Sequence, residues 1–140
     1  MREIKFRGKD KQGRWWKGDL RHTMMILGKP HCRIVNVDKD DYDRLQEIWS
    51  YRIQEDTIGQ FTGIKDGNGT EIFEGDIIEV TLRHNNTIVS TYNAIVDQKE
   101  GAFGFKNKQG FCPFYGQIHE NYKVIGNIHD NPELMEGGAQ

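Results

Sequence analysis

The chain has 140 residues, 36 % of them hydrophobic, and a formal net charge of −2. A chain of this length holds one domain or two small subdomains, and its composition is that of a globular protein with a small core. No apolar run approaches the roughly 18 residues of a membrane-spanning helix. The first residues contain no signal-peptide hydrophobic region. We therefore expect a cytoplasmic protein without a membrane partner. Two cysteines, Cys32 and Cys112, are too few for a disulfide framework, so we expect reduced thiols.

Positive and negative charges are separated along the chain. Residues 1–21 contain eight Lys and Arg against three Asp and Glu, whereas residues 36–79 contain four against twelve. Such asymmetry indicates either a charged partner or two segments that lie side by side and neutralise each other. The second interpretation requires no partner, and we prefer it.

The N-terminal residues predict short strands joined by a polar turn. Ile4 and Phe6 alternate with charged residues, as in a half-buried strand. After a turn at residues 10–13, Trp15 and Trp16 open a second strand, so their side chains point to opposite faces. We expect one tryptophan in the core and the other near the surface.

Residues 24–49 predict two weaker strands and the only helix of the chain. The strands are expected at residues 24–27 and 32–37. Aspartates crowd the start of residues 38–49, which suits the positive end of a helix dipole. Apolar side chains then recur at the three- and four-residue spacing of an amphipathic helix, at Tyr42, Leu45, Ile48 and Trp49.

The central residues contain the strongest turn signals. Asp66-Gly67-Asn68-Gly69 predicts a reverse turn between strands at residues 59–64 and 71–73. Residues 74–76 predict a second tight turn. Beyond it, alternating apolar residues are expected to face the core, namely Ile78, Val80 and Leu82.

Further strands are expected at residues 87–97, 103–105 and 122–128, before a helical turn at residues 131–133. The fold prediction is therefore an all-β chain with one short helix. It consists of an N-terminal β-rich subdomain at residues 1–56, an SH3-like small β barrel at residues 57–131 and a tail at residues 132–140.

Three segments resemble the YopX family, proteins encoded mainly by bacteriophages and prophages. REIKFRGKD followed by GRWWKGDL is similar to the family's opening, and TIGQFTGIKDGNGTEIFEGDII to its central signature. VIGNIHDNPELM resembles its ending. The departures are mild: Ile64 and Gly67 replace the usual Leu and Lys, and Met135 ends the final motif. Residues 24–52 match poorly.

The resemblance implies an SH3-like C-terminal part, a homo-oligomer and a place in the cytoplasm of a bacterial host. It supplies no established biochemical activity, no catalytic residues and no cofactor. We therefore expect a non-catalytic phage or prophage accessory protein that binds a host or phage protein.

Enzymatic and metal-binding interpretations each depend on one small group of residues. Glu71, Glu74 and Asp76 are close enough in sequence for Mg²⁺, but a turn separates them. Zinc could use His31, Cys32, Cys112 and His119, although adjacent ligands on a strand point apart. Cys112 has no neighbouring feature that would activate it as a nucleophile, and Gly67 and Gly69 lack the order of a phosphate-binding loop.

The basic N-terminal segment is the main alternative to protein binding. Cations interleave there with aromatic rings, a combination that can hold phosphates and stack bases. The candidate surface for nucleic acid or another partner contains Lys5, Arg7, Arg14, Trp15, Trp16 and Lys17.

Overall fold

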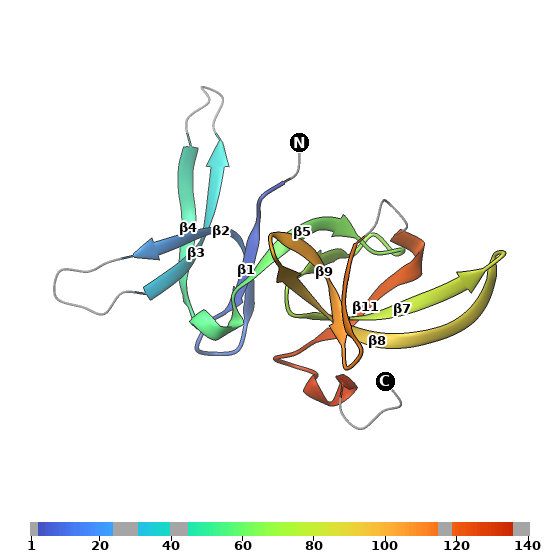
Figure 1. Ribbon diagram of the computed structural model, residues 1–140. Coiled ribbons are helices and arrows are strands. Elements are labelled where there is room, and N and C mark those ends of the chain that lie inside the picture. The colour runs from blue at the N-terminus through green and yellow to red at the C-terminus, as the bar shows by residue number, and fades with distance from the viewer. Residues whose placement is uncertain (1–2, 24–30, 40–44, 115–118, 136–140) are drawn as a thin grey trace. The chain divides into compact units, whose positions relative to one another are not determined.

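The computed structural model describes residues 3–23, 31–39, 45–114 and 119–135, and these residues form strands and short 3-10 helices with no α-helix among them (Figure 1). The all-β prediction is therefore confirmed. The chain divides into two compact units, Met1–Phe61 and Thr62–Gln140.

The first unit is an antiparallel sheet in which β1 to β4 follow each other along the chain and β5 pairs with β1 at the other edge. Its strands are β1 (Phe6–Lys9), β2 (Trp15–Thr23), β3 (His31–Lys39), β4 (Leu45–Ile53) and the start of β5 (Gly59–Lys65), in the spatial order β4-β3-β2-β1-β5. The 3-10 helix η1 (Glu55–Thr57) joins β4 to β5. Ile34, Val35, Ile53 and Phe61 are buried in this unit.

Two glycines allow the strands of the first unit to approach closely. A Cβ atom on Gly8 would lie 2.1 Å from Cγ2 of Ile53, and one on Gly18 would lie 2.4 Å from the carbonyl oxygen of Val35. Neither contact is sterically possible, so only glycine fits these positions without a shift of the neighbouring strand.

The helix predicted for residues 38–49 is wrong, because the described residues of this range form a β-hairpin. β3 extends to Lys39 and β4 starts at Leu45, with Lys39 opposite Leu45 and Val37 opposite Glu47. Cross-strand pairing outweighs local periodicity here, and the aromatic and β-branched residues that follow favour an extended chain. The strand predicted at residues 24–27 lies outside the described residues. The strand predicted at residues 32–37 is confirmed within β3.

The second unit contains an antiparallel sheet in the order β10-β9-β8-β7-β11. Its strands are β7 (Asp76–His84), β8 (Thr87–Lys99), β9 (Ala102–Asn107), β10 (Gly110–Pro113) and β11 (Tyr122–Asn127). The end of β5 pairs with β6 (Glu71–Phe73), and two 3-10 helices complete the unit, η2 (His119–Asn121) and η3 (Pro132–Met135). The sequence did not predict β10, and closure into an SH3-like barrel stays a prediction.

Alternating side chains of β7 and β8 form the core of this unit. Ile72, Ile78, Val80, Ala94, Val96 and Phe105 make one buried cluster. Leu82 was expected to face this core, but it is 45 % exposed. The reason is length: β7 and β8 continue together beyond the strands that flank them (Figure 1). Asn85 and Asn86 close this hairpin with φ values of 51° and 64°, as a tight two-residue turn requires.

The turn in the central motif is held by a buried carboxylate. Asp66 is 4 % exposed, and its Oδ1 accepts hydrogen bonds from the amides of Asn68 and Thr70 at 2.9 Å. Its Oδ2 accepts a third from the amide of Val124 in β11, also at 2.9 Å. Asp66 thus joins the turn to a strand 58 residues further along the chain.

Candidate functional site

One face of the β1–β2–β3–β4 sheet carries six of the Lys and Arg side chains of the first unit. Arg7 lies opposite Lys17, and Lys9 lies opposite Trp15. On the same face, because side chains alternate along β2, Arg21 lies opposite Arg33, which lies opposite Arg52. We call this set the cationic face: Arg7, Lys9, Trp15, Lys17, Arg21, Arg33 and Arg52.

The three arginines of β2, β3 and β4 form a row across adjacent strands. Like charges directly opposite each other destabilise a sheet. Arg33, in the middle, is held by hydrogen bonds that its Nε donates to Ser50 Oγ at 3.0 Å and its Nη2 donates to the Ser50 carbonyl oxygen at 3.1 Å. Arg21 and Arg52 on either side are exposed. The row therefore brings three positive charges onto neighbouring strands of one face.

Trp15 lies among the cations of this face. The guanidinium carbon of Arg7 is 4.8 Å from its ring centroid and the Lys9 ammonium is 5.5 Å away, both within the range of a cation–π interaction. Arg7 itself is only 9 % exposed, so its side chain packs against the Trp15 ring and has little contact with solvent.

Trp16 lies on the opposite face, in a contact that stabilises the sheet. Its ring stacks on Tyr51 at a centroid distance of 3.8 Å, and its Nε1 donates a hydrogen bond to Asp10 Oδ2 at 2.9 Å. Arg14 Nε donates to the same oxygen at 3.0 Å. The hydrogen bond from Trp16, with those from Arg14, lowers the pKa of Asp10 to about 2.

The structure thus divides the six predicted surface residues. Arg7, Trp15 and Lys17 share the cationic face. Trp16 and Arg14 instead both bind Asp10. The Nζ atom of Lys5 lies 3.4 Å from Oε1 of Glu3 and 5.4 Å from the ring centroid of Phe61. Both tryptophans are half-buried, so the expectation of one core and one surface tryptophan is wrong. Arg33 and Arg52 were not predicted as part of this surface, because only the strand register brings them to Arg21.

A second candidate site brings together three different ligand types. His22, Cys32 and Glu55 each offer one ligand atom, and these atoms all lie within 4.8 Å of one another. Cys32 is buried, and its Sγ donates a hydrogen bond to Glu55 Oε1 at 3.8 Å. Burial, followed by the Glu55 carboxylate, raises the pKa of the Cys32 thiol.

This cluster differs from the zinc ligands considered in the sequence. His31 and Cys32 are consecutive in β3 and leave the strand on opposite faces. Cys112 belongs to the second unit, and the side chain of His119 lies outside the described residues. His22 was missed because it lies ten residues before Cys32, and only the pairing of β2 with β3 places the two opposite each other.

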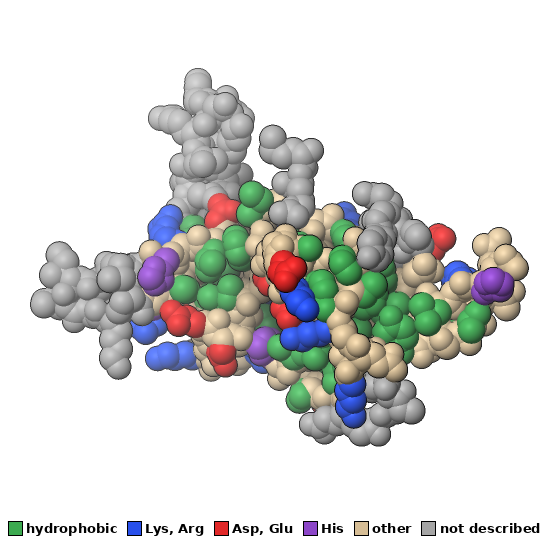
Figure 2. All heavy atoms as spheres, in the orientation of Figure 1, with side chains coloured by type: hydrophobic (Ala, Val, Ile, Leu, Met, Phe, Trp, Pro, Cys, Tyr) green, Lys and Arg blue, Asp and Glu red, His purple; other side chains and the backbone are tan. Residues whose placement is uncertain are grey.

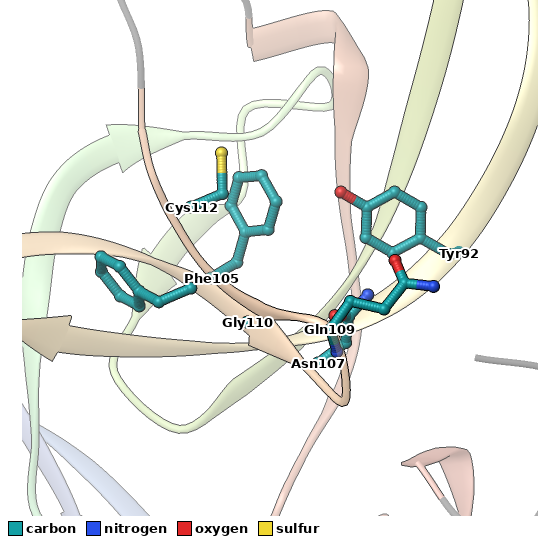
Figure 3. A pocket seen from close by; sticks show the side chains of 7 residues that line it. Tyr92, Phe105, Asn107, Gln109, Gly110 and Cys112 are labelled. Carbon is teal, nitrogen blue, oxygen red and sulfur yellow. The ribbon is translucent and has the colours of Figure 1, made fainter.

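The second unit has a pocket of about 200 Å³ beside Cys112 (Figure 3). Its lining, all of it within the described chain, consists of aromatic, amide, glycine and thiol groups and includes no histidine: Tyr92, Phe105, Asn107, Gln109, Gly110, Phe111 and Cys112. Cys112 Sγ donates a hydrogen bond to the carbonyl oxygen of Pro113 at 3.6 Å. Burial, and secondarily Cys112, raises the pKa of Tyr92.

Of the three acidic residues considered for Mg²⁺, Asp76 has a structural role in a turn. Asp76 is 2 % exposed, and its Oδ2 accepts a hydrogen bond from the amide of Phe73 at 2.7 Å. This contact stabilises the tight turn between β6 and β7.

In the described part of the chain, no helix is long and apolar enough to cross a membrane.

Comparisons with known proteins agree with the motifs. The family model described as YopX protein matches residues 5–136. The chain is also similar to the crystal structure of protein EF1440 from Enterococcus faecalis, with a TM-score of 0.62 and 25 % identity over 97 % of this chain and 100 % of that one. A comparison with curated proteins found no match. Because the family model covers nearly the whole chain, this protein belongs to the YopX family.

Proposed function

We propose that the protein is a non-catalytic phage or prophage accessory protein that binds a protein partner and associates with copies of itself. The observation that carries this proposal is the extended β7–β8 hairpin of the second unit, which we call the ribbon (residues 81–93).

Three large apolar side chains of the ribbon are exposed to solvent. Leu82, Ile88 and Val89 are 45, 56 and 65 % exposed, and Figure 2 shows hydrophobic side chains along this part of the molecule. Exposed apolar side chains gathered on one element are characteristic of protein interaction sites.

The outer edge of the ribbon is also suited to pairing with another strand. Within the described residues, β8 pairs with β9 only from Ile95 to Lys99, so residues 87–93 have no partner strand on that side. Exposed edges are usually protected by charges or proline, yet residues 85–96 contain neither. An extended segment of a partner, or the same strand of a second copy, can add to such an edge.

The test is the mass of the protein in solution, measured by light scattering after size exclusion. We expect the wild-type mass to be at least twice the chain mass of 16.3 kDa. Ile88→Lys and Val89→Lys should each lower it. Gln98→Lys is the matched control, because it places the same charge on an exposed position of β8 where the strand is paired.

A monomeric wild type would refute self-association, and so would ribbon variants that keep the wild-type mass. Protein binding is tested separately by affinity capture from host lysate with and without nuclease. A protein recovered by the wild type and by Gln98→Lys in both conditions, and lost with Val89→Lys, supports the proposal. Partners that disappear with nuclease contradict it.

Nucleic-acid binding is the second candidate, and the arginine row of the cationic face favours it. Neighbouring strands lie about 4.8 Å apart, so three arginines across three strands span about one nucleotide step or more of a phosphate backbone. Trp15, among the flanking cations, offers a ring on which a base can stack.

The test uses fluorescence anisotropy with labelled single-stranded and duplex oligonucleotides over a range of salt concentrations. Arg21→Glu and Arg52→Glu change exposed residues, and each lost phosphate contact should reduce the slope of log affinity against log salt by about 0.7–0.9. Lys123→Glu, an equal charge change on the exposed part of β11, should leave the slope unchanged. Binding that is absent, or that all three variants weaken equally, would refute this candidate.

A further inference from the structure

We propose that His22, Cys32 and Glu55 form a zinc site in the first unit, with one coordination position left for water. This site does not depend on the proposed binding function, because its ligands lie outside both the ribbon and the cationic face.

Four consecutive elements, β2, β3, β4 and η1, bring the ligands together. His22 in β2 lies directly opposite Cys32 in β3, and Cys32 lies directly opposite Ile53 near the end of β4. Two residues later, η1 begins at Glu55. The antiparallel register therefore places an imidazole, a thiol and a carboxylate at one point of the sheet, on the face opposite the cationic face.

The distances suit a tetrahedral ion after a small adjustment. Zinc binds nitrogen and oxygen at about 2.0–2.2 Å and sulfur at about 2.3 Å, which places tetrahedral ligands roughly 3.3–3.8 Å apart. The sulfur of Cys32 and Oε1 of Glu55 are already 3.8 Å apart, and all three ligand atoms lie within 4.8 Å of one another. His22 and Glu55 are exposed, so their side chains can rotate towards the sulfur.

The chemistry of the three groups selects the metal. Thiolate and imidazole are ligands for zinc and its neighbours in the first transition series, whereas Mg²⁺ and Ca²⁺ take oxygen ligands. On binding, the S–H bond of Cys32 breaks, its proton leaves to solvent, and a zinc–sulfur bond forms in its place.

Water can reach the fourth position, because two of the three ligands, His22 and Glu55, are exposed to solvent. Glu55 also borders a hollow of about 350 Å³. Three protein ligands and one solvent ligand are the arrangement of a zinc ion whose coordination is not closed by the protein.

The experiment titrates the full-length, reduced, metal-free protein with Co²⁺, which substitutes for zinc and reports a thiolate ligand through its near-ultraviolet charge-transfer absorption. We expect one equivalent to produce this band and Zn²⁺ to displace it. Cys112→Ser, the matched control, should keep the band at full intensity, and Cys32→Ser should abolish it. His22→Ala and Glu55→Gln should weaken Co²⁺ binding by about tenfold or more, as loss of a direct ligand costs at least what loss of an outer-sphere partner does.

Because Cys32 is buried, its variant can lose stability, and circular dichroism is measured for every metal-free variant. His22 and Glu55 are exposed, so their variants should keep the wild-type spectrum. At the same zinc concentration, zinc should raise the melting temperature of the wild type and Cys112→Ser more than that of these two variants. Absence of the band in folded wild type, its persistence in Cys32→Ser, its loss in Cys112→Ser, or wild-type affinity in both His22→Ala and Glu55→Gln would overturn the proposal.

Discussion

Replacement of Asp66 by alanine tests whether the buried carboxylate of the central motif anchors the second unit. The side chain accepts three backbone hydrogen bonds at 2.9 Å, from Asn68, Thr70 and Val124. Alanine removes both acceptor oxygens, and with them all three hydrogen bonds, and adds no steric conflict, so the effect reports the lost hydrogen bonds.

The expected loss can be worked from these contacts. A hydrogen bond to a charged group contributes about 1.5–3 kcal/mol when its donor cannot turn to water. The amide of Val124 belongs to β11, and loss of its hydrogen bond should lower the free energy of unfolding by about 2 kcal/mol. The two turn amides lie on exposed residues, where water replaces the carboxylate, so loss of each of their hydrogen bonds should lower it by about 0.5 kcal/mol. The total is about 3 kcal/mol, which at about 2 kcal/mol per M corresponds to a fall of about 1.5 M in the urea midpoint.

The assay is urea unfolding followed by circular dichroism, with Asp97→Ala as the matched control. Asp97 also accepts a backbone hydrogen bond, from Gln98 at 2.8 Å, and it forms an ion pair with Lys106 at 2.7 Å. That pair is exposed, so its loss should cost less than about 1 kcal/mol. Equal midpoint shifts in Asp66→Ala and Asp97→Ala would refute the reasoning from buried acceptors.

Two further predictions concern the first unit. Gly8→Ala should lower the free energy of unfolding by about 1–3 kcal/mol, because its Cβ would overlap the Ile53 side chain. The same substitution should cost much less in an Ile53→Ala background. Effects of the two substitutions that simply add in the double variant would contradict this explanation. The hydrogen bond from Trp16, together with Arg14, lowers the pKa of Asp10 from 3.8 to about 2, so the stability contributed by its carboxylate is present above about pH 4 and is lost as the pH falls towards 2. Urea midpoints measured across this interval should fall more steeply for the wild type than for Asp10→Asn, and parallel profiles would exclude this role.

The family and the β class were predictable because both depend on local sequence. Turn residues such as Asp66 and the Asn85–Asn86 pair favour turns through their own side chains, and two-residue alternation marks strands wherever one face is buried. The strands predicted at residues 59–64, 71–73 and 87–97 accordingly coincide with β5, β6 and β8.

The hairpin of β3 and β4 and both candidate sites in the first unit could not be predicted in this way. Residues 38–49 fit helical spacing, and only their long-range partners select the extended chain. The arginine row and the cluster of His22, Cys32 and Glu55 depend on register, and a shift of one residue would move Cys32 or Arg33 to the opposite face of the sheet. Composition and turn chemistry therefore determined what kind of chain this is, whereas strand register, set by packing between distant residues, decided which side chains meet.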